Sequence, residues 1–286
     1  MFNAQETDAC RRLIKLALEE DLGVEGDITS QALIPRDQAG KAFFEARAEG
    51  VLAGVAAASL VFEAIDPRVI FMPILRDAAE VHEGRRIAEV SGSVRSILAA
   101  ERIALNFMQH LSGVATLTSR FVKAIAGLNC KILDTRKTTP GWRLLEKYAV
   151  RCGGGYNHRM GLDAILVKDN HVAALSDKPD ALAYAFTALL QARGSEPIDV
   201  EVNNMAQFKR VLEGANLILL DNMSVDELRE AVRLRNAEQV PVLLEASGGV
   251  TLTNVRAIAE TGVDRISVGA LTHSAPALDI ALEYGA

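Results

Sequence analysis

The second half of the chain repeats one pattern six times, and this pattern limits the possible folds more than any other feature. From Cys130 onward a short apolar run precedes a helical run in each repeat, and the apolar runs are KILDT, DAILVKD, IDVEVNN, NLILLDN, PVLLEASGG and DRISVGALT. The last of them precedes APALDIALEY, which we expect to be the closing helix. Strands that alternate with helices predict a parallel sheet, either an open doubly wound sheet or a (β/α) barrel.

Residues able to do chemistry follow all six predicted strands, and they favour the barrel. They are Asp134 with Arg136 and Lys137, then Lys168, Glu201, Asp221, Ser247 and Gly269. A barrel gathers its site from the carboxyl ends of many strands, whereas an open sheet concentrates the site at one switch point. Six repeats are fewer than the eight of a closed barrel. We therefore expect an open barrel that another part of the chain, or a neighbouring subunit, covers.

The first half of the chain has a different pattern. The N-terminal segment MFNAQETDACRRLIKLALEEDLG, residues 1–23, has the amphipathic pattern of a helix and lacks the apolar run of a signal peptide. Residues 41–90 are typical of strands broken by one helix, and residues 94–128 predict a long helix that is interrupted near Gly113. This half is therefore expected to form an α/β domain of its own.

Composition excludes several classes of protein. Hydrophobic residues make up 49% of the 286 residues and charged residues 24%, so the chain should fold rather than stay disordered. A formal net charge of −6 disfavours nucleic-acid binding. No apolar run reaches the roughly 20 residues of a membrane-spanning helix. Three cysteines without a CxxC motif predict reduced thiols in a cytoplasmic protein.

Positive charge is concentrated in one segment of this acidic chain. Residues 131–171 hold eight lysine or arginine residues against four aspartate or glutamate residues. A solvated helix face would account for Arg143, Lys147 and Arg151. Four of the other cations lie in predicted loops or at a strand end and suggest a ligand with several negative charges, with surface or structural salt bridges as the alternative. These are Arg136, Lys137, Arg159 and Lys168, with His158 and His171 nearby.

Two glycine-containing strand ends are candidates for a phosphate site. The segments SGG at 247–249 and VGALTHS at 268–274 each end a strand and lead toward a predicted helix, the first beginning near Thr253. Exposed backbone N–H groups there would bind phosphate, although tight turns alone would also explain the glycines. The candidate residues are Ser247, Gly248, Gly249, Gly269 and Ala270. The glycines at 153–155 are better explained as a helix stop and a turn that lets the chain approach a ligand.

Glu201 and Asp221 are predicted to end adjacent strands, where their carboxylates could share one cation. Two acidic residues and substrate phosphates are a common way to hold Mg²⁺. The alternative is that one of them pairs with Lys137 or Lys168. Outside these clusters we expect His82 and His110 to be structural residues without partners, and Trp142 to serve packing.

Several of these motifs resemble one known family. The chain contains TRKTTPGWRLLEKYAVRCGGGYNHRMGLDAILVKDNHV, preceded by AERIALNFMQHLSGVATLT and followed by LEASGGV and ISVGALTHSA. These sequences closely resemble quinolinate phosphoribosyltransferases, the carboxylating nicotinate-nucleotide pyrophosphorylases. The likeness extends from EEDLGVEGDIT to THSAPALDIAL, and the TRKTTPG and GGGxNHR blocks are highly specific. Two departures are the bulky Trp142, and Asn203 with Asn204 where an acidic residue often follows Glu201.

The resemblance implies an α/β fold with an N-terminal α/β sandwich domain and an open six-stranded (β/α) barrel. The domains would be residues 1–112 and 113–275, with the tail at about 276–286 able to pack back on the first. It also implies a homodimer with shared sites, or a higher oligomer, in which the N-terminal domain caps the neighbour's barrel. The reaction would be Mg²⁺-dependent transfer of phosphoribosyl from phosphoribosyl pyrophosphate to quinolinate with decarboxylation, a step of NAD biosynthesis.

The resemblance also implies roles for individual residues. Arg102 would reach the neighbour's site, while Arg136, His158, Arg159 and Lys168 would hold the quinolinate carboxylates. Lys137 would lie between the two substrates, and Glu201 and Asp221 would serve Mg²⁺ and the ribose. The pyrophosphate would lie near Asn170 and His171. The 5′-phosphate would be bound by Ser247, Gly248, Gly249 and Gly269, with His273 close by.

Three alternatives remain open at this stage. A Schiff-base barrel aldolase would use Lys168 as its nucleophile, with its amine activated by a cation such as Lys137. A non-catalytic paralogue would bind small anions without releasing pyrophosphate. A paralogue acting on a different base is disfavoured by Arg136, Arg159 and Lys168.

Overall fold

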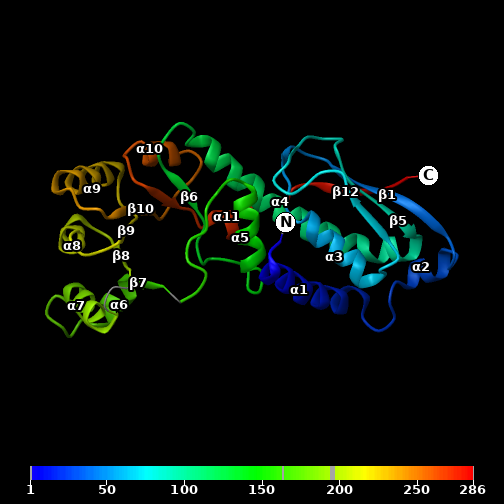
Figure 1. Ribbon diagram of the computed structural model, residues 1–286, viewed down its shortest axis with the longest axis horizontal. Helices are drawn as coiled ribbons and strands as arrows, with labels where there is room; N and C mark the ends of the chain where they lie inside the picture. The colour runs from blue at the N-terminus through cyan, green and yellow to red at the C-terminus, as the bar shows by residue number, and fades with distance from the viewer. Residues whose placement is uncertain (1, 163, 194–196, 286) are drawn as a thin grey trace. The chain divides into compact units, whose positions relative to one another are not determined.

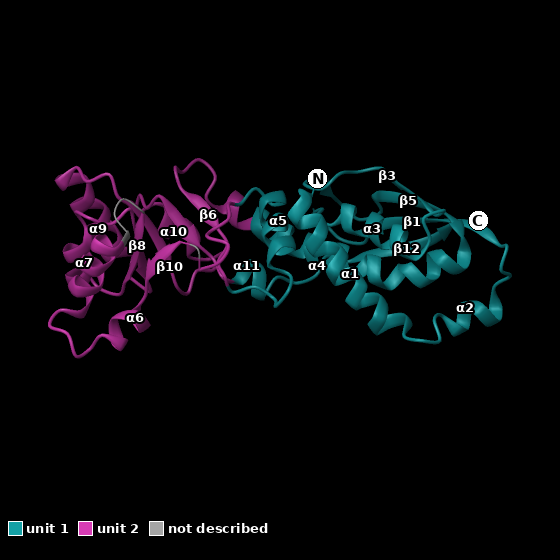
Figure 2. Ribbon diagram, turned by 60° about the horizontal axis from the view of Figure 1, so that its bottom comes forward, with its two compact units in different colours: residues 1–119, 137–155, 270–286 teal, residues 120–136, 156–269 magenta. Residues whose placement is uncertain are grey.

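The computed structural model describes residues 2–162, 164–193 and 197–285. The chain divides into two compact units (Figure 2). Unit 1 comprises Met1–Ser119, Lys137–Gly155 and Ala270–Ala286, and unit 2 comprises Arg120–Arg136 and Tyr156–Gly269. Asp163, within the predicted strand DAILVKD, lies outside the described residues. No helix among the described residues is long and apolar enough to cross a membrane.

Unit 1 is built on an antiparallel sheet with the strand order β12-β1-β5-β3 (Figure 1). Its helices and strands confirm the strands and helix expected over 41–90. The strands are β1 Ala39–Ala46, β2 Gly50–Val51, β3 Ile70–Pro73, β4 Glu80–Val81, β5 Arg86–Ser93 and β12 Ile280–Gly285. The helices are α1 Ala4–Leu22, α2 Ile28–Leu33, α3 Val55–Ile65, α4 Val94–Ala124 (which continues into unit 2), α5 Arg143–Cys152 and α11 Ala270–His273.

Aromatic packing joins α3 to the sheet of unit 1. The ring centroids of Phe44 on β1 and Phe62 on α3 lie 6.0 Å apart, and Phe71 on β3 lies within 5.9 Å of both. Phe44 and Phe62 are buried. Aromatic side chains bury large apolar areas, so these contacts form much of the core between α3 and the sheet.

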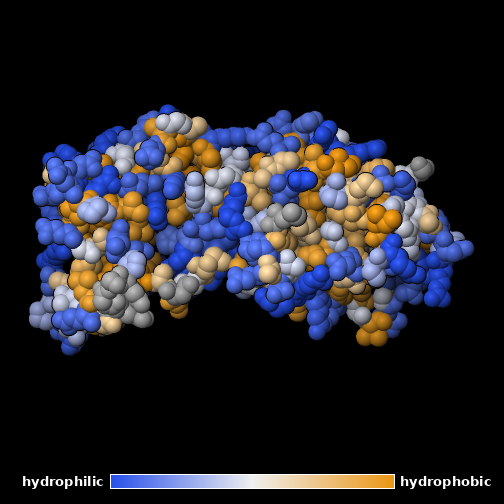
Figure 3. Space-filling model, viewed as in Figure 1, coloured by the Kyte–Doolittle hydropathy of each residue, from blue (hydrophilic) through white to orange (hydrophobic). Residues whose placement is uncertain are grey.

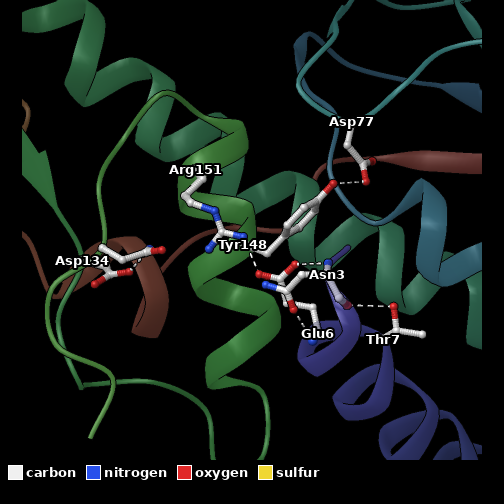
Figure 4. Close-up of polar contacts among 8 residues, drawn as sticks. Asn3, Glu6, Thr7, Asp77, Asp134, Tyr148 and Arg151 are labelled. Atoms are coloured by element: carbon white, nitrogen blue, oxygen red, sulfur yellow. Dashed lines mark hydrogen bonds and ion pairs between the residues drawn. The ribbon is translucent and has the colours of Figure 1, made fainter. Parts of the chain in front are cut away.

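Helix α1 begins with a capping box that also joins it to α5. The Asn3 side chain accepts a hydrogen bond from the Glu6 backbone N–H at 2.9 Å, and the Glu6 carboxylate accepts one from the Asn3 backbone N–H at 2.8 Å. The other carboxylate oxygen of Glu6 pairs with Arg151 on α5 (Figure 4). Elsewhere on α5, the Tyr148 hydroxyl donates a hydrogen bond to the Asp77 carboxylate at 2.7 Å. The helix expected at the N-terminus is confirmed.

The C-terminal segment corrects one prediction. Residues 276–285 contain no helix; Ile280–Gly285 instead form β12, which pairs antiparallel with β1 from Lys41 to Ala46. The alternating apolar residues of ALEYG suit an edge strand as well as a helix, and pairing with β1 satisfies its backbone groups. The predicted closing helix was therefore wrong, because a tertiary contact outweighed local propensity.

Helix α4 corrects a second prediction. It runs without interruption from Val94 to Ala124, through Gly113. A Cβ atom at Gly113 would lie 2.2 Å from the backbone oxygen of Pro276. The glycine is therefore needed for close packing against the C-terminal segment, and it does not break the helix.

Helix α5 corrects two more predictions. Lys147 is 0% exposed, so it does not lie on a solvated face as Arg151 does. Nearly all of α5 from Leu145 to Val150 is buried, which leaves little room for a solvated stripe. Glu146 is also buried and lies 3.0 Å from Nε2 of His110, so His110 has a partner. Trp142 stacks on Phe107 at 4.8 Å, which confirms its packing role.

The glycines after α5 end the helix as predicted, and Gly153 is its C-cap. Their close approach is to α4: a Cβ atom at Gly153 would lie 2.3 Å from the backbone oxygen of Ala115, and one at Gly155 would lie 2.7 Å from Thr118. These two glycines therefore allow two segments of the chain to pack together, rather than allowing a ligand to approach.

Unit 2 contains the predicted six-stranded parallel sheet, in the order β6-β11-β10-β9-β8-β7. The strands β6 and β7 are its two edges, so the barrel is open. The strands are β6 Lys131–Leu133, β7 Ile165–Val167, β8 Ile198–Val202, β9 Leu217–Asp221, β10 Leu243–Ser247 and β11 Arg265–Ser267. The helices are α6 Asp169–Ala174, α7 Ala181–Arg193, α8 Met205–Val211, α9 Val225–Glu238 and α10 Val255–Ala259.

The side chains of this sheet alternate between two faces, as the two-residue period of strands requires. Leu166, Leu217 and Leu219 form a buried cluster. Neighbouring strands are in register, with Glu201 opposite Leu219 and Ser247 opposite Asp221. The face that carries the leucine cluster therefore also carries Glu201, level with Leu219, and ends two residues further along in Asp221 and Ser247.

Asp66, which follows α3, offers a test of the packing in unit 1. Its carboxylate accepts hydrogen bonds from Arg68 at 2.8 Å and from the Ser96 hydroxyl at 2.9 Å, and these donors lower the pKa of Asp66 from 3.8 to about 2. A lowered pKa stabilises the fold above pH 3.8, and this stability is lost as the pH falls through about 2.

We expect Asp66→Asn to lower the free energy of unfolding at pH 7 by about 1 kcal/mol. The difference from the unmodified chain should shrink as the pH falls from 3.8 toward 2. Urea unfolding across this range measures it. Glu63→Gln is the control, because the Arg11–Glu63 pair is about half exposed on both sides and should contribute little. A difference that stays constant with pH would contradict the assignment.

Candidate functional site

The carboxyl ends of the barrel strands bring together many of the predicted site residues. In the order of the sheet, Lys168 follows β7, Glu201 lies on β8, Asp221 ends β9 and Ser247 ends β10. Gly269 follows β11, and Arg136 follows β6. The prediction that Glu201 and Asp221 occupy adjacent strands is confirmed, because β8 pairs directly with β9.

Glu201 and Lys168 form the charged centre of this edge. The Lys168 Nζ atom lies 3.6 Å from Oε2 of Glu201. Burial raises the pKa of Glu201, the positive charge of Lys168 opposes that rise, and the charge of Asp221 adds to it. The two carboxylates are therefore close enough to repel each other, which favours a cation between or beside them.

Asp221 is held by Asn222, which follows it, and by Ser247 at the end of the neighbouring strand β10. One carboxylate oxygen accepts a hydrogen bond from the Ser247 hydroxyl at 2.8 Å, and the other accepts one from the Asn222 amide at 2.8 Å. These donors fix the orientation of the carboxylate, while the remaining lone pairs can still bind a ligand.

The candidate phosphate loop after β10 has a left-handed backbone at two glycines. Gly248 and Gly249 have φ values of +84° and +58°, which favour glycine. The helices that follow the two candidate loops, α10 and α11, have only 5 and 4 residues. The loop N–H groups, rather than a helix dipole, would therefore supply most of any phosphate binding.

Gly248 should tolerate no side chain. A Cβ atom there would lie 2.2 Å from Oδ1 of Asn222, the residue that holds Asp221. We expect Gly248→Ala to raise the KM for phosphoribosyl pyrophosphate about tenfold or more, because the loop and Asn222 must both shift. Gly127→Ala is the control, since Gly127 has a φ of +85° and nothing within 4 Å of a Cβ atom. Equal KM values in both variants would contradict this role for Gly248.

Asp134 holds the segment that carries His158 and Arg159. Its carboxylate, which is fully buried, accepts hydrogen bonds from the Asn157 amide at 2.6 Å and from the His158 backbone N–H at 2.8 Å. The Arg159 guanidinium also donates to the backbone oxygen of Ala164 at 2.8 Å. The sequence marked Asp134 only as a strand-end residue, and its positioning role was missed.

Glu245 was also missed. It is fully buried on β10, and its Oε1 atom lies 3.3 Å from Nε2 of His158. One signal could have identified it: Glu245 precedes Ser247 by two residues, and residues two apart on a strand share a face.

The helix after β7 carries two further predicted residues, Asn170 and His171, both exposed. The backbone N–H of Lys168 donates to Nδ1 of His171 at 3.0 Å.

Four predicted residues belong to unit 1. Arg102 and Lys137 are exposed, Ala270 begins α11, and His273 contacts Ser274 at 2.6 Å. The Lys137 backbone oxygen accepts a hydrogen bond from Thr272 at 2.7 Å. Their part in the site stays a prediction.

The cysteines are poor candidates for nucleophiles. Burial raises the pKa of the Cys10 and Cys130 thiols to about 12, and that of Cys152 to about 11. Nearly all of each thiol is therefore protonated at neutral pH, and a thiol is much less reactive than a thiolate.

The donor set at Glu201 and Asp221 fits Mg²⁺ in its chemistry. Among the described residues no group of three or more histidine, cysteine, aspartate or glutamate side chains could hold a metal ion. Mg²⁺ needs no such group, because it commonly takes one or two carboxylates and completes its shell with water and substrate phosphates.

Comparison with known proteins agrees with this geometry. The family "Quinolinate phosphoribosyl transferase, C-terminal domain" matches residues 114–283, and the corresponding N-terminal domain matches residues 27–112. The chain is 44% identical over 289 residues to a nicotinate-nucleotide pyrophosphorylase [carboxylating] of Mycobacterium leprae, covering 99% of this chain and 100% of that protein. It is 43% identical to a chloroplastic protein of the same name from Arabidopsis thaliana, covering 96% and 82%.

Solved structures give the same result. The nicotinate-nucleotide pyrophosphorylase from Francisella tularensis has a TM-score of 0.89 at 41% identity, covering 97% of this chain and 96% of that chain. The structure from Ehrlichia chaffeensis has a TM-score of 0.90 at 36% identity, covering 96% and 98%. Because both halves match family domains and relatives match over nearly the whole length, the chain belongs to the quinolinate phosphoribosyltransferase family.

Proposed function

We propose that this protein transfers phosphoribosyl from phosphoribosyl pyrophosphate to quinolinate, with decarboxylation, to give nicotinate mononucleotide, pyrophosphate and CO₂. Such a reaction belongs to NAD biosynthesis. The observation that carries the proposal is the edge of the open barrel. There Lys168, Glu201, Asp221 and Ser247 end neighbouring strands in a protein of this family.

The quinolinate pocket would be built on cations. We infer that Arg136, Arg159 and Lys168 bind the two carboxylates of quinolinate, and that His158 contributes to the same pocket. Guanidinium groups bind carboxylates through two parallel hydrogen bonds, so they fix the orientation of the ring as well as its affinity. We place Arg102 at the site of a neighbouring subunit, and Lys137 between the two substrates.

The phosphoribosyl pyrophosphate would lie along the same edge. We infer that its 5′-phosphate binds Ser247, Gly248, Gly249, Gly269 and Ala270, with His273 close by, and that the pyrophosphate lies near Asn170 and His171. Glu201 and Asp221 would hold Mg²⁺, which when bound would neutralise charge on the pyrophosphate.

The residues would act mainly through their charges. As the quinolinate nitrogen attacks C1 of the ribose and pyrophosphate leaves, positive charge develops near C1. The fixed carboxylates of Glu201 and Asp221 would stabilise that charge. No nucleophilic side chain is needed. In the product of this step the ring nitrogen is quaternary, so loss of the 2-carboxylate as CO₂ leaves the bonding electron pair on C2, where the pyridinium charge stabilises it until a proton from water forms the C2–H bond.

We further propose that the functional domains are residues 1–112 and 113–275, with the tail returning to the first domain. The pairing of β12 with β1 supports this return. We also propose a homodimer or a higher oligomer with shared sites. Unit 1 exposes apolar side chains at Ile70, Met72 and Ile74, and orange patches interrupt its hydrophilic surface (Figure 3). A cytoplasmic location stays a prediction.

The decisive experiment mixes the purified protein with quinolinate, phosphoribosyl pyrophosphate and Mg²⁺ and follows nicotinate mononucleotide and CO₂. We expect both products, and their formation should stop when a chelator removes the metal. Borohydride trapping of Lys168 with a carbonyl substrate would instead support an aldolase. Binding of quinolinate without release of pyrophosphate would support a non-catalytic protein.

A further inference from the structure

Side chains hold the short segment at 137–139, which carries the lysine that we place between the two substrates. Within the described chain this segment belongs to no helix or strand. The Lys137 backbone oxygen accepts a hydrogen bond from the Thr272 hydroxyl at 2.7 Å. The Thr139 backbone N–H donates to Oε2 of Glu146 at 3.1 Å. One side chain from α11 and one from α5 therefore fix the two ends of the segment.

Glu146 is fully buried, so its carboxylate depends on donors from the protein. In the part of the chain that the structure describes, each of its oxygens has one. Oε2 accepts from the Thr139 backbone, and Oε1 lies 3.0 Å from Nε2 of His110 on α4. An ionised carboxylate can only accept hydrogen bonds, so Nε2 of His110 carries the hydrogen. Both the neutral Nε2–H ring and the cation have this hydrogen, so the contact does not require one charge state of His110.

His110 is itself held by the turn that precedes α5. Its ring meets the Trp142 indole edge-on, with 5.0 Å between the centroids, and Trp142 stacks on Phe107 of α4 at 4.8 Å. The Trp142 backbone N–H also donates to the Thr139 backbone oxygen at 3.0 Å. Both backbone groups of Thr139 are therefore fixed by residues that contact His110.

We propose that Glu146, oriented by His110, is a positioning residue for Lys137: it fixes the backbone two residues after the lysine. This proposal rests on the proposed function. Lys137 is exposed, and a long side chain loses rotamer freedom when it binds a ligand. A fixed backbone lowers that cost, because it directs the side chain into one region before the substrate arrives. Glu146 acts only through Lys137 and does not contact the substrates.

The experiment measures the Kd for phosphoribosyl pyrophosphate with Mg²⁺ by calorimetry, without quinolinate. Glu146→Met removes both acceptor oxygens at similar volume, and we expect it to raise this Kd about tenfold. His110→Leu should raise the Kd about three- to fivefold, because it leaves Oε1 without its donor. His110→Gln should keep the Kd within about twofold, because its amide can donate in place of Nε2.

A pair of substitutions shows whether Glu146 acts through Lys137. In a Lys137→Met background, Glu146→Met should change the Kd less than about twofold, because the lysine that it positions is absent. Asp66→Asn is the matched control, since Asp66 is another buried carboxylate of unit 1 and accepts hydrogen bonds from Arg68 and Ser96. It should lower stability and leave the Kd within about twofold.

Amide hydrogen exchange reports the contact independently of any ligand. Thr139 is exposed, so its backbone N–H should exchange slowly only because Glu146 accepts its hydrogen bond. In ¹H–¹⁵N spectra of threonine-labelled protein we expect this exchange to be about tenfold faster in Glu146→Met than in the unsubstituted protein. Asp66→Asn should leave it unchanged.

The outcomes separate this proposal from the proposed function. An unchanged Kd in Glu146→Met, or the same rise in the Lys137→Met background, overturns the proposal. If Glu146→Met does not fold, equal Kd values in His110→Leu and His110→Gln overturn it. If the unsubstituted protein binds no phosphoribosyl pyrophosphate while the Thr139 N–H exchanges as expected, the proposed function fails and the contact between Glu146 and the segment stands.

Discussion

Replacing Arg136 with alanine should raise the KM for quinolinate about 100-fold or more, since losing one partner of a desolvated charge pair costs 2–5 kcal/mol. The KM for phosphoribosyl pyrophosphate should change by less than about threefold, because the arginine should contact only the acid. Arg136 follows β6, two residues after the buried Asp134, and its Nε atom is buried. Its side chain is therefore held near the strand end rather than free to move in solvent.

The measurement is steady-state kinetics with each substrate varied in turn. Arg136→Lys should recover only part of the quinolinate affinity, because an ammonium group cannot form the paired hydrogen bonds of a guanidinium. Arg256→Ala is the matched control, since it removes the same charge from an exposed pair with Glu260 in unit 2. Similar increases in both KM values would refute the assignment of Arg136 to quinolinate.

The alternation of strands and helices and their order along the chain could be predicted from the sequence, because both depend on local patterns of apolar residues. The six strand and helix repeats predicted the parallel sheet, and the residues at the strand ends predicted which side chains would meet at its edge. Glu201 and Asp221 illustrate this well, because each simply follows a buried run on neighbouring strands. A strand-end position needs only the two-residue period and the chain order.

Contacts between segments that are distant in the chain could not be predicted from such local patterns. Gly113 was taken for a helix break because its neighbour, the backbone of Pro276, is 163 residues away in the chain. Lys147 was placed on a solvated face because it shares a charged helical run with Arg143 and Arg151, whereas the structure buries all of Leu145 to Val150. The strand β12 was taken for a helix because pairing with β1, and not its own sequence, determines its conformation.

The same distinction explains the missed residues of the site. Asp134 follows β6 and Glu245 lies on β10, and both lie against the segment at 157–159, which is distant from each of them in the sequence. Buried carboxylates are costly unless donors satisfy them, and the Asp134 carboxylate is satisfied by donors of the segment at 157–159. A sequence shows the acid but not its donor.

Replacing Glu201 with glutamine should lower kcat about 100- to 1000-fold, the effect expected when a fixed group that stabilises transition-state charge is removed. The KM for quinolinate should change less than kcat does, because Glu201 is assigned to the ribose and the metal rather than to the acid. Lys168 lies 3.6 Å from Glu201 and loses its partner in this variant. A second variant, Lys168→Met, should therefore raise the quinolinate KM, and the two effects should be separable.

Glu201→Gln should lower kcat without lowering the free energy of unfolding at pH 7. Burial raises the pKa of Glu201 above its ordinary value of 4.5, so the folded protein favours the neutral carboxyl group. Such a group contributes stability below about pH 4.5 that is lost as the pH rises through the folded pKa. At pH 7 without metal the variant should therefore be at least as stable as the unsubstituted protein in urea, and the difference should vanish below the ordinary pKa. Glu213→Gln, on the exposed surface of unit 2, should change neither quantity. A loss of kcat together with a loss of stability would show that Glu201 is a structural residue, and that charge stabilisation at C1 comes from elsewhere.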